Sequence, residues 1–317
     1  MVGAMRIVYL DQNQWVKLAQ ARKHPSKYPE LEELQGEIGR AVLSGKLCLP
    51  LAAANIYETY KVNRRERRQD LALIQSTLSQ GIVFVGRHQR LASEISTVVR
   101  AIHKLPTKDR EEYWFLSNLF SEAFVDHGDD RVQLTFSKNL LDAIRANPAS
   151  FLLDYLVNSP DEVRRSAVRQ WSTGSEKLGQ RIESRRQQFR DEPMAMRRRA
   201  YGAALMINEF EIILGFARDA GAPWETVSDM GSSNAKRLIR DVPAYHVERE
   251  LSLKLEALER SMDENDIRDM ATFCATVPYA DCVISENLFV NLAIQAGLDQ
   301  QFGTVITTDL TEIAKFL

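Results

Sequence analysis

Acidic residues recur at the ends of short apolar runs, or in the helices expected beside them: Asp11, Glu58, Asp269 and Glu286. Asp11 is the clearest case, because it directly follows the apolar run 5–10. A carboxylate at the end of a buried strand is unfavourable without a cation or a proton, and in open parallel sheets ligands bind at this end of the strands. Hard divalent cations such as Mg²⁺ and Mn²⁺ prefer oxygen ligands. Taken together, the four residues predict a divalent-metal site.

Each of these acidic residues also has a structural interpretation. An Asp near the start of a helix is commonly its N-cap, and this applies to Asp11, Asp266 and Asp309. Asp266 lies three residues before Asp269, so both side chains can share one helix face. We therefore add Asp266 to the candidate metal ligands. For any single residue the structural interpretation is the stronger one, and the metal site is favoured only if the fold brings the set together.

Five apolar runs predict buried strands: residues 5–10, 47–51, 82–85, 282–285 and 304–307. Helical patterns lie between consecutive runs, and parallel neighbours require such crossovers, so one parallel sheet of about five strands is expected from both ends of the chain. No strand is expected over residues 106–262, apart from the ambiguous segment 133–136. Stretches 111–124 and 161–220 read as helix. The fold class is therefore α/β, with a discontinuous domain over 1–105 and 263–317 and an all-helical insertion over 106–262.

The acidic residues occur in motifs that resemble those of PIN-like nuclease domains. In chain order these are VYLDQNQW with Asp11, AANIYETY with Glu58, NDIRDMATFCA with Asp269, and the run Ser285-Glu286-Asn287. The resemblance covers roughly residues 5–105 and 263–317. It implies a PIN-like three-layer fold with strand order 3-2-1-4-5, a metal-dependent ribonuclease activity and no nucleotide cofactor. The family often has Asp at the fourth position, where this chain has Glu286 followed by Asn287.

The resemblance assigns roles to individual residues. The metal ligands for Mg²⁺ or Mn²⁺ are expected to be Asp11, Glu58 and Asp269, with Glu286 or Asn287 completing the shell. Such a metal activates water and stabilises the charge that develops on a phosphodiester. Asn13 and Ser285 are candidates for orienting the water or the phosphate. The position of each residue along the chain, rather than the resemblance, predicts that Glu286 faces the other acids and Asn287 caps the helix that follows. The resemblance does not settle the role of Asp281, which is expected to be structural because it lies at the opposite end of its strand.

An arginine-rich segment lies in the expected insertion. Residues 161–200 carry eleven basic residues, ten of them Arg, against six acidic ones, and Arg alternates there with Trp171, Phe189 and Tyr201. This pattern suits phosphate contacts combined with base stacking on single-stranded RNA. The candidate RNA contacts are Arg185, Arg186, Arg197 and Arg198, and the segment is expected to face the same side as the acids. The alternative is a solvated helix face whose arginines pair with nearby acids.

The composition limits the other classes of function. A net charge of −2 over 317 residues provides no global positive field for nucleic acid, so any such contact must be local. Cys48, Cys274 and Cys282 lie in apolar surroundings, which indicates reduced core thiols in a cytoplasmic protein. No apolar run reaches the roughly 20 residues of a membrane span. Neither a phosphate-binding Walker loop nor a dinucleotide-binding glycine motif is found.

The function predicted from the sequence is a cytoplasmic, Mg²⁺- or Mn²⁺-dependent endoribonuclease acting on single-stranded or structured RNA. One alternative is a PIN-like module that binds RNA or a protein without cleavage. Another is a metal-dependent phosphohydrolase acting on a small molecule. A second copy of the chain and a cognate inhibitor protein are further candidate partners. Convergence of Asp11, Glu58 and Asp269 is the observation that separates a catalytic site from a binding module.

Overall fold

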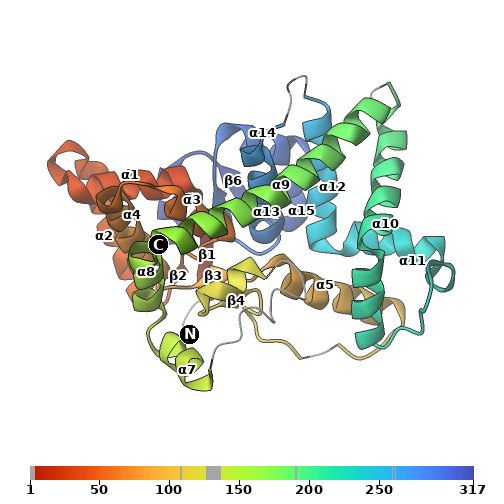
Figure 1. Cartoon of the computed structure of the whole chain (residues 1–317), viewed down its shortest axis with the longest axis horizontal. Helices are drawn as coiled ribbons and strands as arrows, with labels where there is room; N and C mark the ends of the chain where they lie inside the picture. Colours follow the sequence, from red (N-terminus) through yellow and green to blue (C-terminus); the bar gives the residue numbers. More distant parts are fainter. Residues whose placement is uncertain (1–3, 108, 126–136, 190, 259, 261) are drawn as a thin grey trace.

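The computed structural model describes residues 4–317 except 108, 126–136, 190, 259 and 261 (Figure 1). The described chain is an α/β protein that is mostly helical. Helices before the middle of the chain are α1 (Gln12–Lys23), α2 (Pro29–Leu43), α3 (Ala53–Lys61), α4 (Arg65–Ser79) and α5 (Arg87–Ile102). Helices of the middle are α7 (Lys138–Ala146), α8 (Pro148–Asn158), α9 (Asp161–Phe189), α10 (Met194–Asp219), α11 (Val227–Asp241) and α12 (Pro243–Glu256). The last helices are α13 (Glu264–Thr276), α14 (Asn287–Gln295) and α15 (Leu298–Phe302), and short 3-10 helices are η1 (Pro25–Lys27), η2 (Phe120–Phe124) and η3 (Leu310–Phe316).

Four parallel strands form the central sheet in the order β2-β1-β5-β6. Their bounds are β2 (Leu47–Cys48), β1 (Arg6–Leu10), β5 (Cys282–Ile284) and β6 (Val305–Thr307). The prediction that both ends of the chain build one parallel sheet is therefore confirmed. Strand β1 is buried on both faces: Val8 and Leu10 join one apolar cluster, whereas Ile7 and Tyr9 join another. Alternate side chains of a strand point to opposite faces, so an unbroken apolar run suits this central position.

The predicted strand at 82–85 is short and has two kinds of neighbour. Strand β3 (Val83–Phe84) pairs antiparallel with β4 (Leu116–Ser117). On its other side, Leu51 and Val83 form a parallel bridge, and the Phe84 N–H donates to the Leu51 carbonyl at 2.9 Å. Because the bridge lies beyond the end of β2, β3 is assigned to a separate two-stranded sheet.

Strand β4 corrects the prediction that 111–124 is helical. This segment forms β4 and the 3-10 helix η2 instead. The reason is tertiary packing: the Phe115 ring stacks on Tyr279 at 4.6 Å between centroids and lies 6.4 Å from Phe84, and its carbonyl accepts from the Val85 N–H. These contacts override the local helical pattern. The ambiguous segment 133–136 lies outside the described residues.

The helices of residues 106–262 share the core of the rest of the chain. Leu152 of α8 and Ile182 of α9 belong to the two apolar clusters that cover the faces of the sheet. A third cluster joins α5 to α10, α11 and α12. The stretch 161–220 is two helices because Pro193 stands at the break and precedes α10. Helix α9 runs across the molecule and packs against α3, α13 and α12 (Figure 1). The division into two domains stays a prediction.

Helix α10 meets the length and composition of a membrane-spanning helix, among the described residues searched. Core helices of soluble proteins pass the same test, and 33% of its most apolar window is buried inside the protein. One face of α10 packs against α5, α11 and α12. The cytoplasmic location and the absence of a membrane partner stay predictions.

Candidate acidic site

Asp11 lies at the carboxyl end of β1, beside the end of β5. Its backbone N–H donates to the carbonyl of Ile284 at 2.9 Å. One side-chain oxygen accepts the N–H of Gln12 at 2.7 Å, and Asp11 is the N-cap of α1. The residue therefore has its structural capping role and, at the same time, the position at the strand end that the metal-site hypothesis requires.

Glu286 lies two residues beyond the end of β5 and contacts α1. Its Oε1 accepts a hydrogen bond from the Asn13 side chain. Helix α14 begins at Asn287, so Glu286 occupies the N-cap position but makes no side-chain capping bond. The prediction that Asn287 caps this helix is wrong, because Asn287 is already its first residue. Ser285 is only 4% exposed, and its N–H continues the pairing to β6 through the Thr307 carbonyl.

Glu58 and Asp269 approach the strand ends from two helices that pack together, α3 and α13. The Tyr57 hydroxyl of α3 donates to Glu264 of α13 at 2.9 Å. The Arg268 guanidinium lies 4.9 Å from the centre of the Tyr57 ring. These contacts hold Glu58, which follows Tyr57, near Asp269, which follows Arg268.

The four carboxylates share one electrostatic field. The pKa of Asp11 is raised to about 7, mainly by burial and also by the charges of Glu58 and Glu286, against the opposing effect of the Gln12 N–H. Burial, followed by the charges of the other three acids, raises the pKa of Asp269 to about 8. Burial also raises the pKa of Glu58, although Arg268 and Lys61 oppose the shift. Carboxylates raise each other's pKa when they lie close together and too little positive charge is nearby to offset them, and this is the situation here.

The donor set has the chemistry that hard divalent cations prefer, because it consists of carboxylate oxygens from four segments. A cation would relieve the repulsion that raises these pKa values. In the part of the chain that the structure describes, however, no group of three His, Cys, Asp or Glu side chains is arranged to hold a metal ion. The acids are gathered near one another, but their side chains are not closed around one point. Mg²⁺ or Mn²⁺ therefore stays a prediction.

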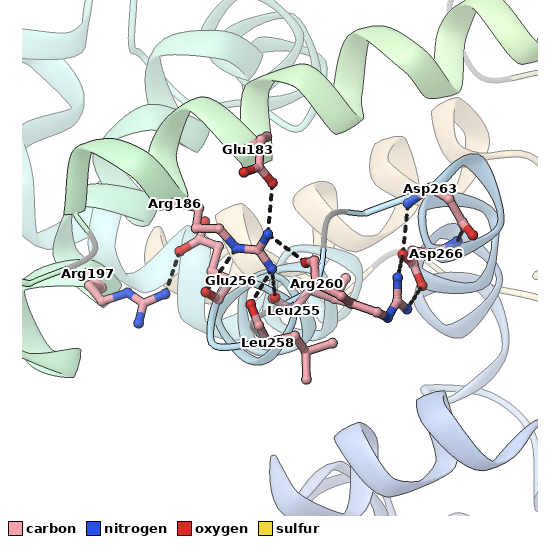
Figure 2. A network of polar contacts seen from close by, with 9 residues as sticks. All are labelled: Glu183, Arg186, Arg197, Leu255, Glu256, Leu258, Arg260, Asp263 and Asp266. Carbon is pink, nitrogen blue, oxygen red and sulfur yellow. Dashed lines mark hydrogen bonds and ion pairs between the residues drawn. The ribbon is translucent and has the colours of Figure 1, made fainter.

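Asp266 is engaged elsewhere, which argues against its place among the metal ligands. Both of its oxygens bind the guanidinium of Arg260, one of them at 2.7 Å (Figure 2). Asp266 also accepts the N–H of Asp263 at 2.9 Å, as the reciprocal half of the capping box at the start of α13. The helix-capping interpretation describes this residue. Asp281 binds Arg6 and the Ile7 N–H, as expected for a structural residue at the opposite end of its strand.

The four arginines predicted to bind RNA contact α12 and the loop that follows it. Arg185 and Arg197 both pair with Glu256, at 3.2 and 3.3 Å, and Arg198 pairs with Glu250 at 2.6 Å. Only Arg198 is largely exposed, at 51% of its side chain. The aromatic residue Tyr201 is buried and donates to Glu248, and the side chain of Trp171 lies outside the described part of the chain. The alternative of pairing with nearby acids therefore describes these arginines, and RNA contact by them is not supported.

Arg186 closes the carboxyl end of α12. Its guanidinium donates to the carbonyls of Leu255, Leu258 and Arg260 at 2.6–2.8 Å, and to the Glu256 carbonyl at 3.2 Å (Figure 2). The last carbonyls of a helix have no partners within the helix, so a cation there is favourable. The segment therefore serves helix packing.

Arg186→Ala is expected to lower the free energy of unfolding by about 2–4 kcal/mol, because four carbonyls lose a charged donor. The measurement is equilibrium urea unfolding. Arg199→Ala is the matched control, since Arg199 is an exposed arginine of the same segment; we expect it to change stability by less than about 0.5 kcal/mol. Equal effects of the two substitutions would contradict the capping role.

Asn55 is a site residue that the sequence analysis missed. Its side-chain oxygen accepts the Ala52 N–H at 2.9 Å, and its amide donates to the Leu10 carbonyl at 3.2 Å. Asn55 thus ties the start of α3 to the residue before Asp11. An Asn in the first turn of a helix signals capping, but nothing local indicates the bond to β1, which lies 45 residues away in the chain.

The chain matches no protein-family model, no curated protein and no solved structure. The functional argument therefore rests on the geometry and charge of the acidic site and on the motifs that surround it.

Proposed function

We propose that the protein is a PIN-like, divalent-metal-dependent endoribonuclease. One observation carries the proposal: Asp11, Glu58, Asp269 and Glu286 come from four segments at both ends of the chain and lie close enough to raise the pKa values of the first three. They gather where β1 and β5 end, the edge at which open parallel sheets bind ligands. A separate structural role for each residue, such as helix capping, would not explain why the four acids lie close together.

The PIN-like topology is part of the proposal. Counting β3 beside β2 through the Leu51–Val83 bridge yields five strands in the order β3-β2-β1-β5-β6, which is the order 3-2-1-4-5 of the family. The chain from 106 to 262 would then be an insertion between two parts of one nuclease domain. Two backbone hydrogen bonds support this topology: the Leu51 N–H donates to the Ile82 carbonyl at 3.0 Å, and the Phe84 N–H donates to the Leu51 carbonyl at 2.9 Å.

In the proposed site, Asp11, Glu58 and Asp269 would hold the cation, and Glu286 would complete the set of ligands. When bound, Mg²⁺ or Mn²⁺ lowers the pKa of water and offsets charge developing on the phosphodiester. Asn13 orients Glu286 through its side-chain amide. Asp11 and Asp269 are half-buried, which reduces their contact with water and strengthens their electrostatic interactions. RNA as the substrate rests on the family resemblance.

One observation favours the alternative of a binding module that does not cleave. Among the described residues the acids are not closed around a metal position, and such a module would not need them to close. Saturable Mn²⁺ binding to the purified chain separates the two readings. A module without a metal site binds RNA or protein equally well in EDTA.

The test of the proposed function is cleavage of end-labelled single-stranded RNA during a titration with Mn²⁺. Glu286→Gln is expected to cut the rate at least about tenfold at limiting Mn²⁺ and to recover partly at high Mn²⁺, because ligand loss weakens affinity. Asp281→Asn is the control, since Asp281 binds Arg6 at the opposite end of β5 and should leave cleavage unchanged. If the wild-type chain cleaves no RNA at any Mn²⁺ concentration, the function is rejected. If Glu286→Gln follows the wild-type curve, only the role of Glu286 is rejected.

A further inference from the structure

Three buried side chains form a closed ring of hydrogen bonds behind the acidic site. The Gln12 amide donates to the Thr59 hydroxyl at 3.0 Å, Thr59 donates to the Gln75 carbonyl oxygen at 2.8 Å, and the Gln75 amide donates back to Gln12 at 3.1 Å. Gln12 is 8% exposed, and the other two are fully buried. Each member donates once and accepts once within the ring. All three side chains are therefore paired within the ring.

Two ring members are the chain neighbours of two acids. Gln12 follows Asp11 at the start of α1, and Thr59 follows Glu58 within α3. Successive helical residues point about 100° apart, so Thr59 can be buried while Glu58 keeps part of its surface exposed. Gln75 lies on α4, which carries none of the four acids. The ring thus links the residue after Asp11 and the residue after Glu58 to helix α4.

A hydrogen-bonded ring restricts the relative position of the helices more than apolar packing at the same place does. Apolar contacts are non-directional, so helices can shift against each other with little change in energy. Buried hydrogen bonds lose strength steeply with distance and angle, and a fully paired buried network specifies one arrangement. Thr59 and Gln12 are 47 residues apart in the chain. Their contact therefore sets the separation of α1 and α3, and with it the separation of Asp11 and Glu58.

We propose that the Gln12–Thr59–Gln75 ring fixes the position of Asp11 relative to Glu58, so that its members are positioning residues of the acidic site. This rests on the proposed function. Partners that orient metal ligands commonly change metal affinity 10- to 100-fold when removed. Asn55, which links α3 to the Leu10 carbonyl, fixes the start of the same helix and is not a member of the ring.

The test measures Mn²⁺ binding to the full chain by isothermal titration calorimetry, with urea unfolding of each variant alongside. Thr59→Val keeps the volume and removes the hydroxyl. Thr59→Ser keeps the hydroxyl and removes a methyl group. A triple variant, Gln12→Met with Thr59→Val and Gln75→Met, replaces the whole ring with apolar groups and leaves no buried amide unpaired. Ser76→Ala is the control on α4, because Ser76 bonds only to the Leu73 carbonyl of its own helix.

We expect the Mn²⁺ dissociation constant to rise at least about tenfold in Thr59→Val and in the triple variant. Thr59→Ser should restore wild-type affinity although it loses stability, and the triple variant should keep stability although it loses affinity. If the ring had a purely structural role, Mn²⁺ affinity and stability would change together in these variants. Wild-type affinity in the folded triple variant overturns the ring proposal and leaves the proposed function standing. A wild-type chain that shows no saturable Mn²⁺ binding overturns both.

Discussion

Asp11→Asn is expected to lower the rate of Mn²⁺-dependent RNA cleavage by about 1000-fold while the protein stays folded. The substitution removes the charge at the centre of the acidic site. Asn is as good an N-cap as Asp, so the bond to the Gln12 N–H can be kept. The measurement is cleavage of labelled RNA at saturating Mn²⁺, with circular dichroism to establish folding.

Asp309→Asn is the matched control for this experiment. Asp309 also follows a strand and caps the next helix, where its side chain accepts the Thr311 N–H at 2.9 Å. The pKa values of the two residues shift in opposite directions: the Thr311 N–H lowers the pKa of Asp309, whereas burial and neighbouring acids raise the pKa of Asp11. We expect the control to cleave at the wild-type rate. If the Asp11→Asn protein cleaves RNA at the wild-type rate, Asp11 is not part of the catalytic site. If the Asp11→Asn protein unfolds, the role of Asp11 is helix capping alone.

The metal-free protein is expected to lose stability as the pH rises from about 4 to about 8. Asp11 and Asp269 have pKa values of about 7 and 8 in the folded state, against roughly 3.9 in an unfolded chain. Between these values the folded state binds more protons than the unfolded state, so the free energy of unfolding falls with increasing pH. The two carboxyls titrate together, and we expect a total loss of several kcal/mol. Urea unfolding at a series of pH values in EDTA measures it.

Two comparisons isolate this effect from other titrating groups. Asp269→Asn should flatten the dependence above pH 5 and be more stable than the wild type at pH 8, because one of the repelling charges is gone. Mn²⁺ at pH 8 should restore stability to the wild type and do so much less in the variant. An identical pH profile for wild type and Asp269→Asn would show that the raised pKa values do not control stability.

Local sequence determined the sheet strands and the place of the acids along the chain. The apolar runs 5–10, 282–285 and 304–307 became β1, β5 and β6. The two central strands, β1 and β5, are covered on both faces and therefore need apolar side chains at successive positions. Helices between the runs required the strands to be parallel. Once the strands are parallel, Asp11 and Glu286 must lie at the same edge of the sheet, so this part of the site followed from the order of elements.

Tertiary structure alone decided which polar side chains meet. Arg186 and Arg198 resemble any other arginine of their segment, and their partners on α12 and beyond lie 52 to 74 residues away. Helical periodicity identifies the face on which a side chain lies but not the residue opposite it. For the same reason the sequence did not reveal the pairing of Asp266 with Arg260 or the strand β4, whose packing on Tyr279 outweighed a local helical pattern.

The acidic site itself depends on both levels. The types and order of Asp11, Glu58 and Asp269 are visible in the sequence, since a carboxylate near a strand end is a local feature. The spacing of Asp11 and Glu58 is not visible there, because the ring that we propose to fix it joins side chains of three helices, Gln12, Thr59 and Gln75. Hydrogen-bond geometry between distant segments exists only after the helices have packed, and it is this packing that brings separately unremarkable acids into one electrostatic field.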